Sequence, residues 1–200
     1  MKAVVIGTSH GGPKALQQLI SALPVDFPVP VLIVLHRHPD GKARAENQLN
    51  LACVVTVKQA EEKETVEAGT VYFAPPGYHL LIEDDETLSL SVDEKVNYSR
   101  PSIDVLFESA ADVYGENLVA ILLTGANSDG AEGLRSVKEA GGITIVQKPE
   151  DAEAATMPKA ALRLMKPDKV LSLSEITSCL SKFLLNHSVD FYECIKGVRS

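Results

Sequence analysis

Short continuous apolar runs alternate along the chain with segments whose apolar residues recur every three or four positions. Continuous apolar runs are typical of strands buried on both faces of a sheet, whereas the longer period is typical of amphipathic helices. The pattern predicts strands over residues 2–6, 29–35, 54–58, 70–73, 79–82, 88–92, 118–123, 143–146 and 169–173. It predicts helices over residues 11–23, 46–52, 102–114, 130–140, 152–165 and 174–185.

The alternation of strands and helices predicts an α/β fold with a doubly wound, Rossmann-like, mostly parallel sheet and helices on both of its faces. A Pro-Pro-Gly turn at 75–77 and an acidic turn at 83–86 separate short strands, which predicts a small antiparallel hairpin region. Met157-Pro158 is expected to interrupt the helix over residues 152–165. Periodicity is lost after residue 185, so residues 1–185 are predicted to form one folded domain and residues 186–200 a C-terminal tail or packing arm.

Composition excludes several classes of function. The chain has 200 residues, with 27 Asp and Glu against 19 Lys and Arg, and a formal net charge of −8. An acidic chain without a Lys/Arg run is a poor candidate for binding nucleic acid. No apolar run reaches the roughly 18 residues of a membrane-spanning helix, and the start of the chain is typical of a core strand rather than a signal peptide. We therefore expect a cytoplasmic protein that is not embedded in a membrane.

Cysteine usage also fits the expected cytoplasmic location. Cys53, Cys179 and Cys194 are odd in number and show no CxxC spacing, which argues against a disulfide framework and against a zinc site.

Ser9 is the first candidate for chemistry, because ligands and catalytic groups in such sheets lie beyond the carboxyl ends of the strands. It follows the first predicted strand within Gly-Thr-Ser-His-Gly, which fits the pattern G-x-S-x-G. In this pattern a tight turn exposes the serine hydroxyl at the start of a helix, where backbone N–H groups can stabilise an oxyanion. The alternative is a glycine-rich turn that binds phosphate or only joins a strand to a helix.

His36 follows the second predicted strand and is the candidate general base. The alternative is a histidine at the solvent edge of the sheet. His10 and His38 compete for the role, although the side chain of His10 is expected to point along the next helix and His38 lies further out in a polar loop.

Asp129 follows the strand predicted over residues 118–123 and could fix the tautomer of the histidine by accepting its N–H. The alternative is an N-cap of the helix predicted over residues 130–140. Asp104 and Asp112 are further candidate acids, but both fall within a predicted helix and are expected to face solvent.

Several blocks resemble, in order, motifs of the CheB family of chemotaxis protein-glutamate methylesterases. The resemblance extends over roughly residues 3–175. The blocks are IGTSHGGP at 6–13, VLH at 34–36, YFAPPGYH at 72–79, RPSIDVLF at 100–107, LLTG at 122–125, SDGAEG at 128–133, VQ at 146–147 and MP at 157–158.

The resemblance implies that residues 1–185 are a serine esterase domain that hydrolyses glutamate γ-methyl esters on the cytoplasmic helices of chemoreceptors. Some family members also deamidate receptor glutamines. It implies no metal and no organic cofactor, a chemoreceptor segment as the protein partner and a receiver domain as regulator. By motif, Ser9 is the nucleophile, His36 the base and Asp129 the orienting acid.

The resemblance also implies weaker assignments. His10, Gly11 and Ala126 would lie near the oxyanion. His79 and Arg100 would contact substrate, with backbone capping and a structural ion pair as the respective alternatives.

Three positions near the site depart from the family pattern. Ala126 stands where Met is usual, Asn127 where Gly is common, and His10 where Thr is common. No receiver domain precedes Lys2, so we expect a stand-alone enzyme, an enzyme regulated by a separate receiver-domain partner, or a fragment.

Two other functions remain open at this point. One is a catalytically weakened docking module of the same fold, which the departures would explain. The other is a phosphate- or nucleotide-binding α/β protein, although Gly7, Gly11 and Gly12 fit the spacing G-x-G-x-x-G badly.

Overall fold

A computed structural model describes residues 2–36 and 53–182. In chain order the elements are β1 (Ala3–Thr8), α1 (Gly12–Ile20), β2 (Val31–Leu35), β3 (Thr56–Gln59), β4 (Thr70–Phe73), β5 (His79–Ile82), β6 (Leu88–Ser91), α3 (Ile103–Tyr114), a 3₁₀ turn η1 (Gly115–Asn117), β7 (Leu118–Leu122), α4 (Ala131–Glu139), β8 (Ile143–Gln147), α5 (Thr156–Leu164), β9 (Lys169–Leu171) and α6 (Leu173–Lys182).

Seven of the strands form one parallel sheet with the order β3-β4-β2-β1-β7-β8-β9. Strands β5 and β6 pair antiparallel in a small separate sheet. The chain thus winds in both directions from β1, which lies between β2 and β7. The predicted α/β class, the mostly parallel sheet and the small antiparallel hairpin are confirmed.

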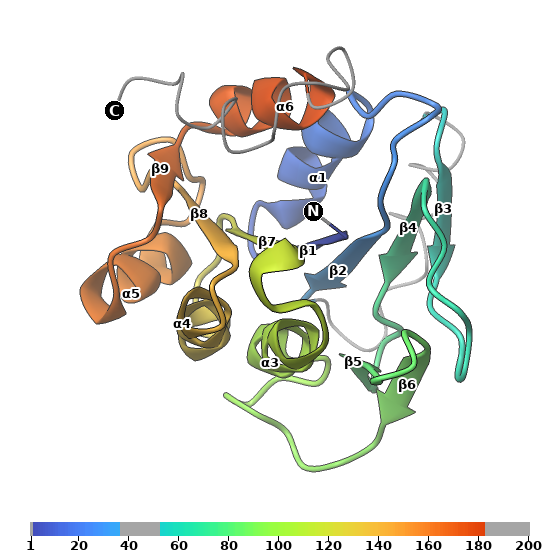
Figure 1. Ribbon diagram of the computed structural model, residues 1–200. Helices are drawn as coiled ribbons and strands as arrows, with labels where there is room; N and C mark the ends of the chain where they lie inside the picture. Colours follow the sequence, from blue (N-terminus) through green and yellow to red (C-terminus); the bar gives the residue numbers. More distant parts are fainter. Residues whose placement is uncertain (1, 37–52, 183–200) are drawn as a thin grey trace.

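Helices cover the sheet on both faces, as Figure 1 shows, with α1 and α6 on one face and α3, α4 and α5 on the other. Each face has its own apolar core. Strands β1, β2 and β7 contribute alternate side chains to the two cores, which explains why these strands are apolar throughout.

The register of the central strands determines which loops meet at the carboxyl edge of the sheet. Thr8 lies opposite Leu35, and Gly7 lies opposite Leu122. The residues that follow β1, β2 and β7 are therefore neighbours in space, although they are far apart in the sequence.

The structure differs from the predicted elements mainly at one helix. Helix α5 begins at Thr156 rather than at residue 152, which places Pro158 in its first turn, where proline is tolerated, so it does not interrupt the helix. The predicted helix over residues 46–52 and the predicted tail over residues 186–200 lie outside the described residues.

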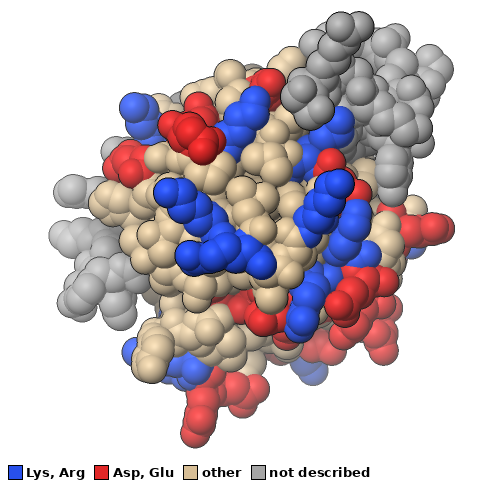
Figure 2. Space-filling view, turned by 90° about the vertical axis from the view of Figure 1, so that its left-hand side faces the viewer, with Lys and Arg blue, Asp and Glu red and all other residues tan. Residues whose placement is uncertain are grey.

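The charge on the surface is unevenly distributed. Figure 2 shows Lys and Arg side chains gathered on the side that carries α5 and β9, where Lys159, Arg163 and Lys166 are exposed. Within residues 2–36 and 53–182, no helix is long and apolar enough to cross a membrane.

Candidate active site

Ser9 lies in the tight turn between β1 and α1. Its N–H donates to the carbonyl of Thr124 at 3.0 Å, and its own carbonyl accepts the N–H of Gly12 at 2.9 Å. Gly11 has φ +81°, and a Cβ there would lie 2.8 Å from the Cβ of Glu153. Only glycine adopts this conformation in this space without strain, so the turn that presents Ser9 depends on Gly11.

His36 follows β2 directly, and its N–H donates to the carbonyl of Thr8 at 3.0 Å. Its Nε2 lies 2.8 Å from Oδ2 of Asp129, with the two side chains 11% and 0% exposed. A carboxylate only accepts, so Nε2 carries the proton and Nδ1 carries the lone pair. The structure thus brings His36 and Asp129 into contact across 93 positions of sequence.

The carboxylate of Asp129 also receives donors from the start of helix α3. The Ser102 hydroxyl donates to Oδ1 at 2.8 Å, the Ile103 N–H donates to Oδ2 at 2.7 Å and the Asp104 N–H donates to Oδ1 at 3.3 Å. The N-cap of α4 is Gly130, without a side-chain cap. The alternative in which Asp129 caps the following helix is therefore wrong, because its carboxylate binds the start of α3 instead.

These donors determine the charge on Asp129. Burial acts to raise the pKa of the Asp129 carboxyl, but hydrogen bonds from His36, from the Ile103 N–H and from Asn97 outweigh it and lower this pKa to about 2. Asp129 is therefore an anion beside the ring of His36 near neutral pH.

The expectation that Asp104 faces solvent is wrong, since it is 3% exposed. The first turn of α3 points its carboxylate at helix α4, where it accepts the Gly133 N–H at 2.7 Å, and Asn97 donates to it at 2.6 Å. Burial, together with the nearby charge of Asp129, raises the pKa of Asp104 to about 7. Asp112, further along the same helix, is exposed as expected.

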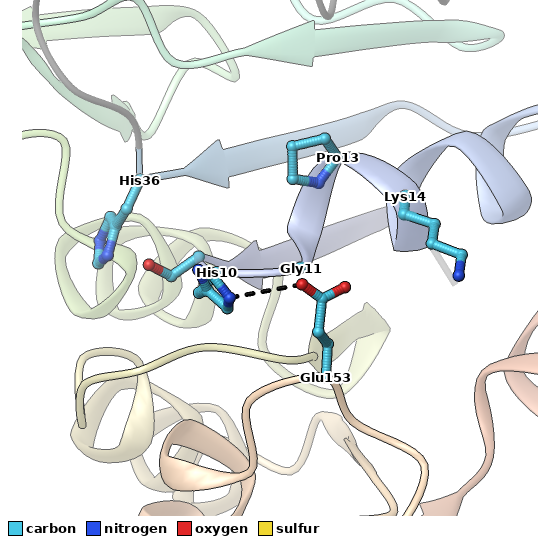
Figure 3. A pocket seen from close by; sticks show the side chains of 7 residues that line it. His10, Gly11, Pro13, Lys14, His36 and Glu153 are labelled. Carbon is cyan, nitrogen blue, oxygen red and sulfur yellow. Dashed lines mark ion pairs between the residues drawn. The ribbon is translucent and has the colours of Figure 1, made fainter.

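Ser9 and His36 line one open pocket of about 510 Å³. The other lining residues are His10, Gly11, Pro13, Lys14 and Glu153. Figure 3 shows His10 directed toward Glu153, and the His10 Nε2 lies 3.4 Å from the Glu153 Oε1. This ion pair joins two residues that line the pocket, and it links the turn before α1 to the loop before α5 (Figure 3).

Two backbone donors beside Ser9 have no partner in the part of the chain that the structure describes. They are the N–H groups of His10 and Gly11, which precede the first turn of α1. Ala126 is exposed and does not line the pocket.

His79 and Arg100 bond to the backbone. His79 is 2% exposed, its Nδ1 accepts the Ser102 N–H at 3.2 Å, and its Nε2 donates to the Glu94 carbonyl at 3.0 Å. This geometry supports the backbone-capping alternative for His79 over contact with a substrate. Arg100 donates to the carbonyls of Val92 and Asp93, at 2.5 and 2.8 Å, and within the described residues it does not form the ion pair given as its alternative.

Two asparagines at the site were not among the candidates. Asn97 donates to the carboxylates of both Asp104 and Asp129, and it falls in a loop without any recognisable motif. Asn127 donates to Nδ1 of His36 at 3.2 Å, and its departure from the family pattern was the only signal for it.

His38, the other histidine considered for the role of base, lies outside the described residues. In residues 2–36 and 53–182 no group of three or more His, Cys, Asp or Glu side chains could hold a metal ion.

Comparisons with known proteins show the family of the chain. The sequence model of the CheB methylesterase family matches residues 4–180. A relative from Leptospira interrogans is 49% identical over 175 residues, which cover 88% of this chain and 91% of the relative. The protein-glutamate methylesterase/protein-glutamine glutaminase of Archaeoglobus fulgidus is 39% identical over 90% of this chain and 53% of its own length.

A solved structure is similar over almost the whole chain. The crystal structure of the Thermotoga maritima CheB methylesterase catalytic domain has a TM-score of 0.87 and 34% sequence identity, and the match covers 92% of this chain and 98% of that one.

Proposed function

Because the chain belongs to the CheB methylesterase family, we propose that it is a protein-glutamate methylesterase with Ser9, His36 and Asp129 as its catalytic triad. The observation that carries this proposal is the 2.8 Å contact between His36 Nε2 and the buried carboxylate of Asp129, in a histidine that shares a pocket with Ser9. A serine beside a histidine oriented by a buried carboxylate is the arrangement that activates a hydroxyl as a nucleophile.

In the first half-reaction, Nδ1 of His36 takes the proton of the Ser9 hydroxyl while Oγ forms a bond to the ester carbonyl carbon. The carbonyl π electrons move to the oxygen, which becomes an oxyanion. When the carbonyl reforms, the bond to the methoxy oxygen breaks and that oxygen leaves as methanol with the proton from Nδ1. Asp129 stabilises the imidazolium that exists between these two proton transfers.

The oxyanion needs donors that are already in place. The unpartnered N–H groups of His10 and Gly11 at the start of α1 are the donors that we propose, since they directly follow Ser9 and lie at the positive end of a helix dipole. In the second half-reaction, His36 takes a proton from water, the hydroxide oxygen attacks the acyl carbon, and Ser9 leaves with that proton. The product is a glutamate side chain.

The substrates we propose are glutamate γ-methyl esters, and also glutamines, on the cytoplasmic segments of chemoreceptors. The same attack on a glutamine amide would release ammonia in place of methanol. Similarity to proteins named methylesterase and glutaminase supports both activities. We further propose that a receiver domain controls the enzyme, as the family resemblance implies.

The test is methanol release from methylated cytoplasmic receptor fragments, measured for the wild type and for Ser9→Ala. We expect the variant to release methanol at least about a thousandfold more slowly, because residual catalysis would come only from binding and the oxyanion donors. Lys14→Ala, a change of an exposed side chain that lines the same pocket, is the control for damage to the pocket surface.

Equal release by the wild type and Ser9→Ala would refute the role of Ser9. Absence of release by the wild type, together with no labelling of Ser9 by a fluorophosphonate, would favour a docking module of the same fold.

A further inference from the structure

Both ring nitrogens of His36 have partners in the single loop that joins β7 to α4. Nε2 bonds to Asp129 at 2.8 Å, and Nδ1 lies 3.2 Å from Nδ2 of Asn127. Because Nε2 carries the proton that Asp129 accepts, Nδ1 is the nitrogen left to accept a proton from Ser9. Asn127 therefore donates a hydrogen bond to the lone pair of His36 Nδ1, which the proposed reaction needs free to accept a proton.

The orientation of the Asn127 amide follows from its second contact. Its Oδ1 accepts the N–H of Asp129 at 3.3 Å, which directs the NH₂ group, and not the oxygen, toward His36. The contact with Nδ1 is thus a hydrogen bond from an amide N–H to a ring lone pair. It is compatible only with the neutral ring, in which Nδ1 carries no proton.

Among the described residues, the Ser9 hydroxyl is not bonded to the ring nitrogen of His36 that Asn127 contacts. In the part of the chain that the structure describes, no hydrogen bond joins the Ser9 hydroxyl to His36, although both line the same pocket. The single lone pair of Nδ1 cannot serve as a full acceptor for the amide and for the serine hydroxyl together.

We propose that Asn127 acts as a latch on the catalytic base, holding Nδ1 of His36 in the resting enzyme and moving away before Ser9 is activated. This inference rests on the proposed function, since it assigns Nδ1 the proton of Ser9. The latch is defined as the hydrogen bond from Asn127 Nδ2 to His36 Nδ1.

The loop around Asn127 allows such movement. Ala126 and Ser128 are exposed and Asn127 is half-buried, whereas Gly125 and Asp129 on either side are buried. Gly125 is fixed by backbone hydrogen bonds to Ala154 and Met157. A change of rotamer at Asn127 would open the latch without moving Asp129.

The test is the inactivation of Ser9 by a small fluorophosphonate, followed by intact mass. In this reaction Oγ bonds to phosphorus, the phosphorus–fluorine bond breaks, fluoride leaves, and His36 accepts the serine proton. We would measure the maximal inactivation rate and the half-saturating probe concentration for the wild type, Asn127→Ala and Asn127→Ser.

The two substitutions separate the donor from the rest of the side chain. Asn127→Ala removes the latch and the contact to Asp129, whereas Asn127→Ser keeps an uncharged oxygen that can accept the Asp129 N–H but is too short to reach Nδ1 of His36. Both should raise the maximal rate about three- to tenfold, the factor that corresponds to one neutral hydrogen bond, with the half-saturating concentration unchanged. Ser128→Ala, an exposed side chain of the same loop, is the matched control and should keep the wild-type rate.

A maximal rate that falls or stays equal in both variants, with melting temperatures equal to the wild type, would overturn the latch and leave Asn127 as a support for the ring or as a bystander. Labelling of the wild type and both variants at one rate overturns the latch alone, because the serine is then still active. No labelling of the wild type or of either variant overturns the latch. If the wild type also releases no methanol, the proposed function is overturned with it; if it does release methanol, only the latch is overturned.

Discussion

A single side chain, Asp129, joins the proposed catalytic machinery to the packing of helix α3. One carboxylate oxygen accepts from His36 and from the Ile103 N–H, and the other accepts from Ser102 and Asn97. Removal of this carboxylate would leave buried donors without a partner, which costs about 1–3 kcal/mol for each. Loss of activity on replacing Asp129 is therefore interpretable only alongside a measurement of folding.

Asp104 carries a second prediction at this scale. Burial holds its folded-state pKa at about 7, above its ordinary value of 3.8. The unfolded chain gives up this proton at lower pH than the folded protein, so the folded state loses stability as the pH rises from 3.8 to about 7. Asp104→Asn removes this titration, and relative to the variant the wild-type free energy of unfolding should fall by about 4 kcal/mol across that window.

Urea unfolding followed by circular dichroism at several pH values between these limits measures this difference. Asp112→Asn, on the exposed side of the same helix, should follow the wild-type curve. Curves for the wild type and Asp104→Asn that stay parallel would contradict the assigned titration.

At the scale of elements, the packing of α3 against α4 supports the site, because the start of α3 binds the carboxylate of Asp129 just before α4. Helix α4 approaches α3 closely at Gly133, where an added Cβ would lie 2.8 Å from the Cα and the carbonyl oxygen of Asp104. The same glycine donates its N–H to the Asp104 carboxylate. The absence of a side chain at residue 133 thus permits both the packing of the helices and the bond between them.

Gly133→Ala should therefore destabilise the fold, although alanine is the better helix former by about 1 kcal/mol. The methyl group would meet backbone atoms that cannot move aside, so we expect a net loss of about 1–3 kcal/mol and a lower melting temperature. Ser136→Ala, one turn further along α4, is the control and should change stability by less than about 0.5 kcal/mol. A melting temperature that rises in Gly133→Ala would show that the two helices separate without cost.

The elements also show what the sequence could predict. The strands predicted over residues 70–73 and 79–82 have the bounds of β4 and β5, because local pattern and turn residues determine both. The predicted start of α5 at residue 152 was wrong. Residues 152–155 are rich in alanine, but their backbone forms hydrogen bonds outside the helix. Ala154 accepts the Gly125 N–H at 3.0 Å and donates to the Thr124 hydroxyl at 2.8 Å, so tertiary contacts outweigh helix propensity there.

In the site, too, local sequence pattern predicted some residues, whereas tertiary contacts determined others. The positions of Ser9, His36 and Asp129 were predictable because each follows an apolar strand, and parallel strands present their carboxyl ends at one edge. The contacts of Asn97 were not, since this residue reaches Asp129 from a loop 32 positions away without a motif. Nothing local in the sequence encodes such a contact.

At the scale of the whole molecule, stability depends on a sheet that is buried on both faces. Ile121 lies in β7, next to the central strand β1, and is fully buried in the core shared with α1 and α6. Ile121→Ala should lower the free energy of unfolding by about 2–5 kcal/mol, because it removes buried methyl groups and leaves a cavity that the sheet cannot close. Chemical denaturation measures this loss.

Val25→Ala is the control for this core substitution, since Val25 is 73% exposed. Its free energy of unfolding should stay within about 0.5 kcal/mol of the wild type. Equal losses at the two positions would contradict the conclusion that burial in this core stabilises the fold.

The position of β1 between β2 and β7 has a consequence for the order of events on the ribosome. Residues that pair with one edge of β1 are synthesised soon after it, but the partner for its other edge, Leu118–Leu122, emerges much later. Until then the nascent chain carries Ser9 and His36 without Asp129, and the open edge of β1 can still accept another strand. If the proposed triad is right, a nascent chain that ends before Asp129 lacks the carboxylate that orients His36, so it should not hydrolyse esters.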